Sequence, residues 1–179
     1  CSPVNHATDI DATIEHRTAS VGRPHDNWEV KIIREDGSLA DIEEIGEVCA
    51  KGYGVMACYW GDPERTAETI DSEGFLHSGD LGVMDENGFV RITCRIKDME
   101  IRGGENIYPR EIEEFLCKHP DIDDAQVFGV PDEKYGEQLA VWILPKDGAS
   151  MGEEDIREFC ADQISHYKVP RYIKFVDEF

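Results

Sequence analysis

The spacing of apolar residues changes near residue 97, and this change limits the possible folds more than any other feature of the sequence. Upstream of it, apolar residues alternate with polar ones in runs that are joined by turn sequences, which is typical of antiparallel hairpins. Downstream of it, strand-like runs alternate with helical runs in which apolar residues recur every three or four positions. The sequence therefore predicts an α+β fold, with a β-rich part at 1–96 and a compact α+β part at 97–179.

Turn and cap residues locate the expected elements. Asp36-Gly37 predicts the turn of a first hairpin, and Asp62 followed by Pro63 predicts the start of a short helix. The predicted hairpins cover 28–52 and 74–96, the strands 99–104, 124–132, 136–146 and 172–179, and the helices 62–70, 108–120 and 153–164. Residues 1–27 show no clear period and are expected to form loops.

The charge of the chain excludes several classes of partner. Lysine and arginine number 18 against 39 aspartates and glutamates, which gives a formal charge of −21. Such a field repels phosphate backbones and anionic lipid, so binding to nucleic acid or to a membrane surface is not expected. No apolar run approaches the roughly 20 residues that cross a bilayer, so no transmembrane segment is expected. Acidic pairs such as Glu43-Glu44 and Glu113-Glu114 are expected to be solvated surface.

Cysteine usage bears on the compartment. The six cysteines are scattered without a C-x-x-C pair, and no histidine stands at zinc-ligand spacing from any of them. We therefore expect reduced cysteines, no metal site, and an intracellular, cytoplasmic protein. The sequence does not indicate an oligomeric state.

The segment GFLHSGDLG, residues 74–82, carries the first candidate site residue. A carboxylate fixed in a tight turn at Asp80 can accept two hydrogen bonds from a vicinal diol such as that of ribose. We expect Gly79 and Asp80 to end a strand, and the hairpin to return Arg95 to the same region, where its guanidinium could hold a ribose oxygen or a phosphate. The alternatives are an Asp that stabilises its own turn and a purely structural Asp80–Arg95 ion pair.

A second candidate lies in IRGGENIYP, residues 101–109. Gly103 and Gly104 permit positive φ and let the backbone approach another chain or a ligand closely, just before a helix whose N-terminus favours an anion. Taken alone, the motif favours a simple hairpin turn ahead of a helix. No nucleophile, base and acid stand in a hydrolase-like arrangement.

Taken in order, these motifs closely resemble the adenylate-forming superfamily, which includes acyl-CoA synthetases, firefly luciferase and the adenylation domains of peptide synthetases. The resemblance runs from GYGVMACYWGDPERTAETIDSEGFLHSGDLG through CRIKDMEIRGGENIYPREIEEFL to ISHYKVPRYIKFVDEF, and so covers nearly the whole chain. RGGENIYPREIE and ISHYKVPRYI are most similar to the medium-chain fatty acyl-CoA synthetases. In such enzymes a carboxylic acid reacts with Mg-ATP to give an acyl-adenylate and pyrophosphate, and the acyl group then passes to coenzyme A.

The resemblance implies roles for individual residues. Asp80 and Arg95 would contact ATP or AMP, and Lys97 would be the hinge about which a small, mobile C-terminal domain turns. Gly103, Gly104 and Glu105 would line the channel for the pantetheine arm of CoA. Lys134 and Lys168 are further candidates for the CoA phosphates. ATP, Mg²⁺, CoA and a fatty acid are thus the expected ligands, and Cys94 departs from the glycine that is usual in the family at that position.

The resemblance also implies that the chain is a C-terminal piece of a longer enzyme. Residues 1–96 would be the β-rich end of the large adenylation domain, and 97–179 the small domain, truncated before the adenylation lysine. No catalytic residue is then expected within the chain, and the piece alone is expected to be inactive. Two alternatives stay open: an adenylate-forming ligase with a carrier-protein acceptor, and a non-catalytic nucleotide-binding module.

Overall fold

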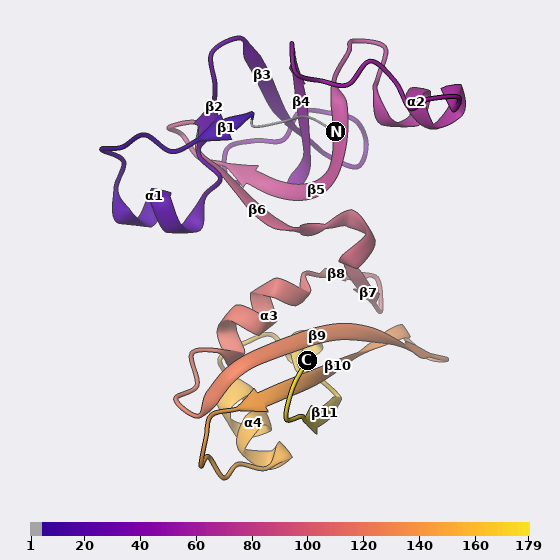
Figure 1. Cartoon of the computed structure of the whole chain (residues 1–179). Helices are drawn as coiled ribbons and strands as arrows, with labels where there is room; N and C mark the ends of the chain where they lie inside the picture. Colours follow the sequence, from indigo (N-terminus) through magenta and orange to yellow (C-terminus); the bar gives the residue numbers. More distant parts are fainter. Residues whose placement is uncertain (1–4) are drawn as a thin grey trace. The chain divides into compact units, whose positions relative to one another are not determined.

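A computed structural model of the protein describes residues 5–179. The chain divides into two compact units, Cys1–Lys97 and Asp98–Phe179 (Figure 1). Each unit has its own sheet and its own core, and the two are described in turn.

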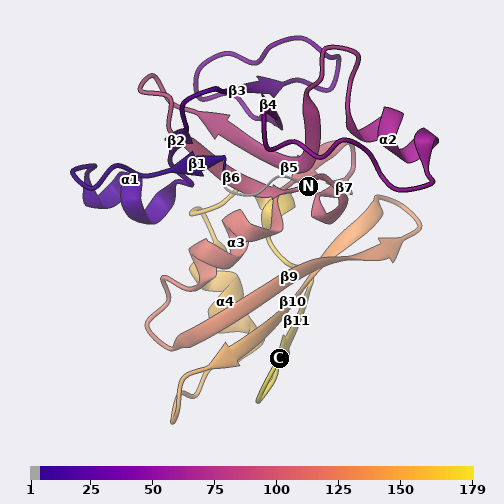
Figure 2. The ribbon, with the colours of Figure 1, turned by 45° about the horizontal axis from the view of Figure 1, so that its top comes forward.

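Unit 1 is built on a four-stranded antiparallel sheet with the strand order β3-β4-β5-β6 (Figure 2). Its strands are β3 (Trp28–Ile33), β4 (Gly46–Gly52), β5 (Leu76–Met84) and β6 (Val90–Arg95). Both predicted hairpins are therefore confirmed. Consecutive residues of β4 belong to different apolar clusters: Val48 packs with Ile32 and Val90, whereas Cys49 packs with Ile33 and Phe75. Because neighbouring side chains of a strand point to opposite faces, this sheet carries apolar clusters on both faces.

The expectation of loops over 1–27 holds only in part for the residues that the structure describes there. Loops and turns separate three short elements, β1 (His6–Ala7), α1 (Ile14–Ala19) and β2 (Arg23–Pro24), and β1 pairs with β2. Helix α1 is capped by Thr13, whose hydroxyl accepts a hydrogen bond from the backbone N–H of His16 at 3.2 Å. This helix buries no residue, so it has no apolar period from which it could be predicted. The predicted helix after Asp62 is confirmed as α2 (Pro63–Thr69), with Asp62 as its N-cap.

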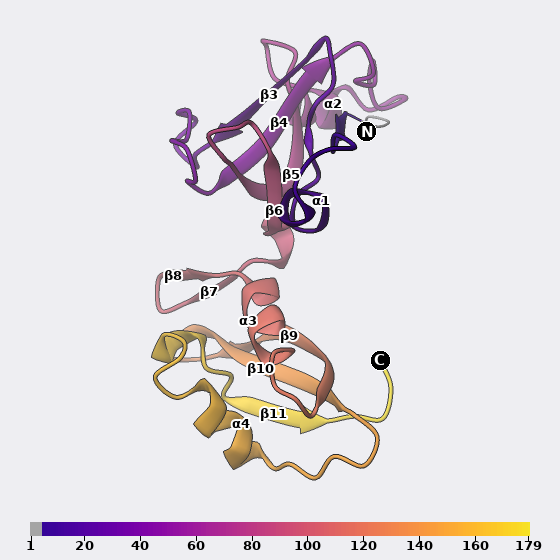
Figure 3. The same ribbon diagram turned by 90° about the vertical axis from the view of Figure 1, so that its left-hand side faces the viewer.

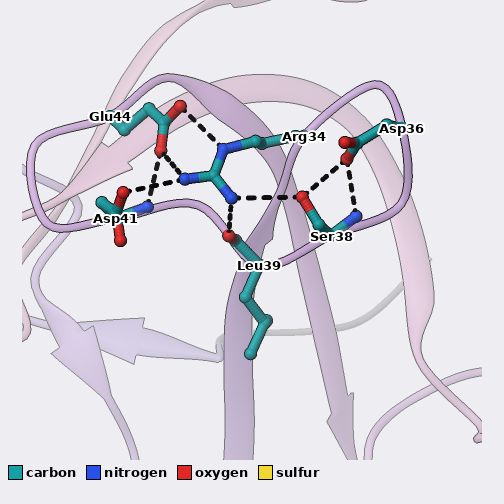
Figure 4. A network of polar contacts seen from close by, with 6 residues as sticks. All are labelled: Arg34, Asp36, Ser38, Leu39, Asp41 and Glu44. Atoms are coloured by element: carbon teal, nitrogen blue, oxygen red, sulfur yellow. Dashed lines mark hydrogen bonds and ion pairs between the residues drawn. The ribbon is translucent and has the colours of Figure 1, made fainter.

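The loop between β3 and β4 is organised around one guanidinium, that of Arg34 (Figure 4). Its Nε donates to Oε1 of Glu44 at 2.7 Å, its Nη2 contacts the carboxylates of Glu44 and Asp41, and its Nη1 reaches the Ser38 hydroxyl and the Leu39 carbonyl. The hydrogen bond from Arg34 lowers the pKa of Glu44 below its ordinary value. The expectation that Glu44 is merely solvated surface is therefore wrong, since it fixes the loop.

Unit 2 is an α+β unit with a five-stranded sheet (Figure 3). Strand β10 lies beside three others: β9 and β7 pair with it antiparallel, and β11 pairs with it parallel. Its strands are β7 (Glu100–Arg102), β8 (Glu105–Ile107), β9 (Ile122–Asp132), β10 (Gly136–Pro145) and β11 (Tyr172–Phe175), and its helices are α3 (Pro109–Leu116) and α4 (Glu153–Cys160). Single 3₁₀ turns are η1 (Ile96–Asp98), at the junction of the units, and η2 (His166–Lys168).

One contiguous core holds unit 2 together. Ile112 and Leu116 of α3 and Ile156 and Cys160 of α4 all pack into it, and each is at most 1% exposed. The sheet contributes alternate residues of β10, namely Leu139, Val141 and Ile143. Because alternate residues share a face, both helices cover the same face of this sheet. The sequence periods at 108–120 and 153–164 thus identified the buried stripes.

Several boundaries in unit 2 differ from the predicted ones. Helix α3 ends at Leu116 and not at 120, and strand β11 ends at Phe175 and not at 179. Helix α4 ends at Cys160 and not at 164, because Ala161 is extended (φ −61°, ψ 131°) and Asp162 is left-handed (φ 59°). The residues after Gly104 form the short strand β8, which the sequence did not indicate. Within residues 5–179, no helix combines the length and the apolar character needed to cross a membrane.

Candidate nucleotide site

Asp80 lies in an irregular part of β5 and not at its end, which corrects the prediction. The pairing of β5 with both neighbours shifts register here, between Glu47 and Cys49 on β4 and between Leu81 and Gly82 on β5 itself. Gly79 has φ 75°, a left-handed conformation that glycine adopts without steric cost. A bulge inside a paired strand can re-aim a side chain while the strand continues, and bulges are frequent beside functional sites.

The structure brings Asp80 and Arg95 together, as the hairpin predicted. The two are register partners on β5 and β6, and Nε of Arg95 lies 3.4 Å from Oδ1 of Asp80. The side chains are 35% exposed for Asp80 and 61% exposed for Arg95. Such an exposed ion pair contributes roughly 0–1 kcal/mol to folding, so it holds neither group tightly. Both can exchange this contact for one with a ligand.

A residue that sequence reasoning missed supports this turn. Oε1 of Glu47, on β4, accepts a hydrogen bond from the backbone N–H of Gly79 at 2.9 Å. On the other side, the Ser78 hydroxyl accepts one from the backbone N–H of Asp80 at 3.0 Å. The carboxylate of Asp80 is thus presented on a backbone that is held at two neighbouring positions. Only the facing of β4 and β5 reveals Glu47, because it is 33 positions away from Asp80 along the chain.

The predicted hinge residue and the predicted CoA-loop residues follow Arg95 further along the chain. Lys97 is the middle residue of η1 and the last residue of unit 1. Gly103 and Gly104, with φ of 63° and 90°, form the turn between β7 and β8, and Glu105 opens β8. All three turn residues are exposed, and a side chain at Gly104 would meet no heavy atom within 4 Å. The hairpin geometry is therefore the one that glycine permits, and its backbone is open to solvent.

The two lysines that the sequence offered for phosphates differ in their surroundings. The Lys168 ammonium is held by the Glu111 carboxylate at 2.7 and 2.8 Å, and its side chain is only 18% exposed. Lys134 is exposed and lies beside Tyr135, with its ammonium 4.7 Å from the ring centroid. Lys134 is therefore the better placed of the two to meet a phosphate from solvent.

Comparison with known proteins identifies the family. Residues 111–179 match the family model of the AMP-binding enzyme C-terminal domain. The chain is 47% identical to the putative acyl-CoA synthetase YngI of Bacillus subtilis, over 99% of this chain and 33% of that protein. It is 46% identical to the rat mitochondrial medium-chain acyl-CoA ligase ACSF2, over 98% of this chain and 29% of that protein. The chain therefore spans about a third of the length of these relatives.

Solved structures agree with this assignment. The ATP-bound structure of MatB from Rhodopseudomonas palustris aligns with a TM-score of 0.92 and 32% identity, over 97% of this chain and 34% of that one. The structural match thus includes both units, whereas the family model covers only residues within unit 2. On these grounds, residues 111–179 belong to the AMP-binding enzyme C-terminal domain family, and the chain as a whole is homologous to acyl-CoA synthetases and structurally similar to adenylate-forming enzymes.

Proposed function

We propose that the intact protein is an ATP-dependent acid–thiol ligase, which converts a fatty acid, ATP and CoA into acyl-CoA, AMP and pyrophosphate through an acyl-adenylate. The observation that carries this proposal is the exposed Asp80–Arg95 pair on the bulge of β5. An ionised carboxylate can accept hydrogen bonds from both hydroxyls of a ribose, which is the geometry that nucleotide sites use. Arg95 supplies donors for a ribose oxygen or a phosphate at the same place.

The same proposal gives the junction of the units a role. Residues 1–96 would belong to the large adenylation domain and 97–179 to the small one, with Lys97 as the hinge between them. Hinges are a few residues at element ends that absorb a change in φ and ψ, and Lys97 sits in a single 3₁₀ turn where the two units meet. A change of conformation between half-reactions would keep water away from the labile mixed anhydride.

The β7–β8 turn would meet the second substrate. In this proposal the exposed backbone of Gly103 and Gly104, with Glu105, lines the path of the pantetheine arm, and Lys134 is available to the phosphates of CoA. Mg²⁺ would enter with ATP and offset the phosphate charge during adenylation. The proposed acid substrate is a medium-chain fatty acid, because the ACSF2 relative is a medium-chain acyl-CoA ligase. The thiols of Cys49, Cys58, Cys117 and Cys160 are free, which supports an intracellular location.

Pyrophosphate exchange by the intact protein tests this proposal. With ATP and Mg²⁺ present, we expect labelled pyrophosphate to enter ATP only when an acid is added, with the fastest exchange for medium-chain acids in a series from acetate to palmitate. Thioester formation should then follow with free CoA. Absence of exchange with every acid would refute adenylation, and transfer to a carrier protein but not to CoA would refute the proposed acceptor.

A further inference from the structure

Three side chains with different metal-binding atoms converge on one face of unit 1. Glu47 and Cys49 stand two positions apart on β4, and so share a face, and Cys49 is the register partner of His77 on β5. A carboxylate oxygen, the Sγ atom and a ring nitrogen of these residues all lie within 4.8 Å of one another. Between residues 5 and 179, this is the one such group of three. We propose that Glu47, Cys49 and His77 form a binding site for a thiophilic divalent cation, best suited to Zn²⁺.

The distances fit a zinc ion closely at one pair and after a small adjustment at the other. Nδ1 of His77 lies 3.5 Å from Sγ of Cys49 and 2.7 Å from Oε2 of Glu47. Zinc–ligand bonds of about 2.0–2.3 Å in tetrahedral geometry put a nitrogen and a sulfur ligand about 3.5 Å apart, and a nitrogen and an oxygen about 3.3 Å apart. The first separation is already present. The second requires a small rotation of the partly exposed Glu47 and His77 side chains, which would give up the His77–Glu47 hydrogen bond.

The contacts among the three side chains leave one of them without a good hydrogen bond. Both the Glu47 oxygen and the Cys49 sulfur approach the same ring atom, Nδ1 of His77. A single N–H there can serve the carboxylate well but cannot also serve the sulfur, whereas a cation would satisfy all three atoms at once. The same geometry argues against a catalytic triad, because a histidine that relays a proton between a thiol and a carboxylate uses its two nitrogens separately.

Neighbouring groups are placed to orient the ligands. Metal-bound histidines commonly present their second nitrogen to a carboxylate. Nε2 of His77 lies 3.7 Å from Oδ2 of Asp71, slightly beyond hydrogen-bonding distance, so a small shift of the ring would let the two bond. The Asp71 carboxylate is itself fixed, because its Oδ1 accepts hydrogen bonds from the backbone N–H groups of Glu73 at 2.9 Å and Phe75 at 2.8 Å. The Glu47 carboxylate is likewise oriented, by its bond from Gly79.

Charge and access also suit a cation. Glu47 and Asp71 bring two negative charges, and binding would displace the thiol proton of Cys49 to solvent and add a third. Lys31 is the positive group nearby, and its charge is already shared by Asp71 at 3.6 Å and Glu73 at 3.2 Å. Cys49 is fully buried, but the side chains of Glu47 and His77 are 20% and 30% exposed, so an ion and a water ligand can reach the site. Histidine spacing along the sequence did not indicate this site, because its ligands come from two paired strands.

Cobalt binding to the purified protein tests the proposal, since Co²⁺ replaces Zn²⁺ and gives a thiolate charge-transfer absorption in the near ultraviolet. To remove adventitious binding, the background carries Cys1→Ser, Cys58→Ser and Cys117→Ser. We expect one Co²⁺ per chain, release of a proton on binding, and loss of the absorption when Zn²⁺ is added. Cys49→Ala should abolish the absorption. Asp71→Asn should weaken binding by about tenfold, as expected of a residue that orients a ligand.

Matched controls make the outcome decisive. Cys160→Ala removes another fully buried thiol, which lies in unit 2 and away from the proposed site. This variant should keep the absorption unchanged. If Cys49→Ala does not fold, His77→Ala takes its place, because that side chain is partly exposed and lies outside the apolar clusters. No thiolate absorption in the background protein, or an absorption that survives Cys49→Ala or His77→Ala, would overturn the proposal.

Discussion

Replacement of Asp80 by alanine separates the role of this residue in folding from its role in nucleotide binding. In the structure its carboxylate lies 3.4 Å from Arg95, in a pair of which the guanidinium side is 61% exposed. Exposed pairs contribute at most about 1 kcal/mol to the free energy of unfolding, and the substitution does not touch Gly79. We therefore expect the urea midpoint of unfolding of Asp80→Ala to stay close to that of the wild type.

The cost for ATP should be much larger. Two hydrogen bonds from ribose hydroxyls to an ionised carboxylate are worth at least about 1.5 kcal/mol each, or about 3 kcal/mol together. Since about 1.4 kcal/mol corresponds to a factor of ten, the KM for ATP in pyrophosphate exchange should rise about 150-fold. The assay varies ATP at a saturating concentration of acid, on the intact protein, with urea unfolding followed in parallel.

A matched variant shows whether the effect is specific. Arg91 forms an ion pair with Glu43 at 3.2 Å, and its side chain is 56% exposed. Arg91→Ala therefore removes a comparable surface pair from β6, the strand that also carries Arg95. We expect Arg91→Ala to change neither the KM for ATP nor the stability. A KM for ATP within about threefold of the wild-type value in Asp80→Ala would refute the assignment of Asp80 to the ribose.

Three further predictions concern the hinge, a pH dependence and the core. Lys97→Pro, which fixes φ in the 3₁₀ turn, should slow one half-reaction more than the other in single-turnover assays; equal slowing would argue against a pivot there. Burial raises the pKa of Glu100, so the folded state favours the protonated carboxyl and the stability of the protein falls as pH rises above the ordinary value of 4.5. Glu100→Gln should therefore raise the urea midpoint at neutral pH and leave it unchanged below pH 4.5. No difference at neutral pH would contradict this. Leu116→Ala, at a fully buried position, should lower the free energy of unfolding by about 2–5 kcal/mol, whereas Cys117→Ala at the exposed neighbour should not.

The elements that could be predicted are those with a strong local signal. The period of Ile112 and Leu116 and the cap at Asp62 located α3 and α2, because burial of one stripe and satisfaction of the first N–H groups both act within a few residues. Helix α1 has no buried stripe and was missed. The end of α4 coincides with a left-handed backbone at Asp162, which the sequence pattern did not predict.

Side-chain environments were harder to predict than elements, because they depend on residues distant in sequence. Glu113 illustrates this: it was expected to be solvated, but its carboxylate accepts the backbone N–H of Val127 at 2.8 Å, and burial raises its pKa. The support of Gly79 by Glu47 likewise requires the pairing of β4 with β5. By contrast, the approach of Arg95 to Asp80 followed from the hairpin alone, since a hairpin fixes which residues face each other.

The central claim is that the Asp80 carboxylate holds the ribose hydroxyls of the nucleotide. A thermodynamic cycle tests it most directly, with ATP and 2′,3′-dideoxy-ATP each titrated against the intact wild-type protein and Asp80→Ala. Loss of the hydroxyls should weaken binding to the wild type by about 150-fold. It should leave binding to Asp80→Ala nearly unchanged, because the carboxylate that recognises the hydroxyls is already missing from that variant. An equal loss for both proteins would show that the hydroxyls are recognised elsewhere and would contradict the account.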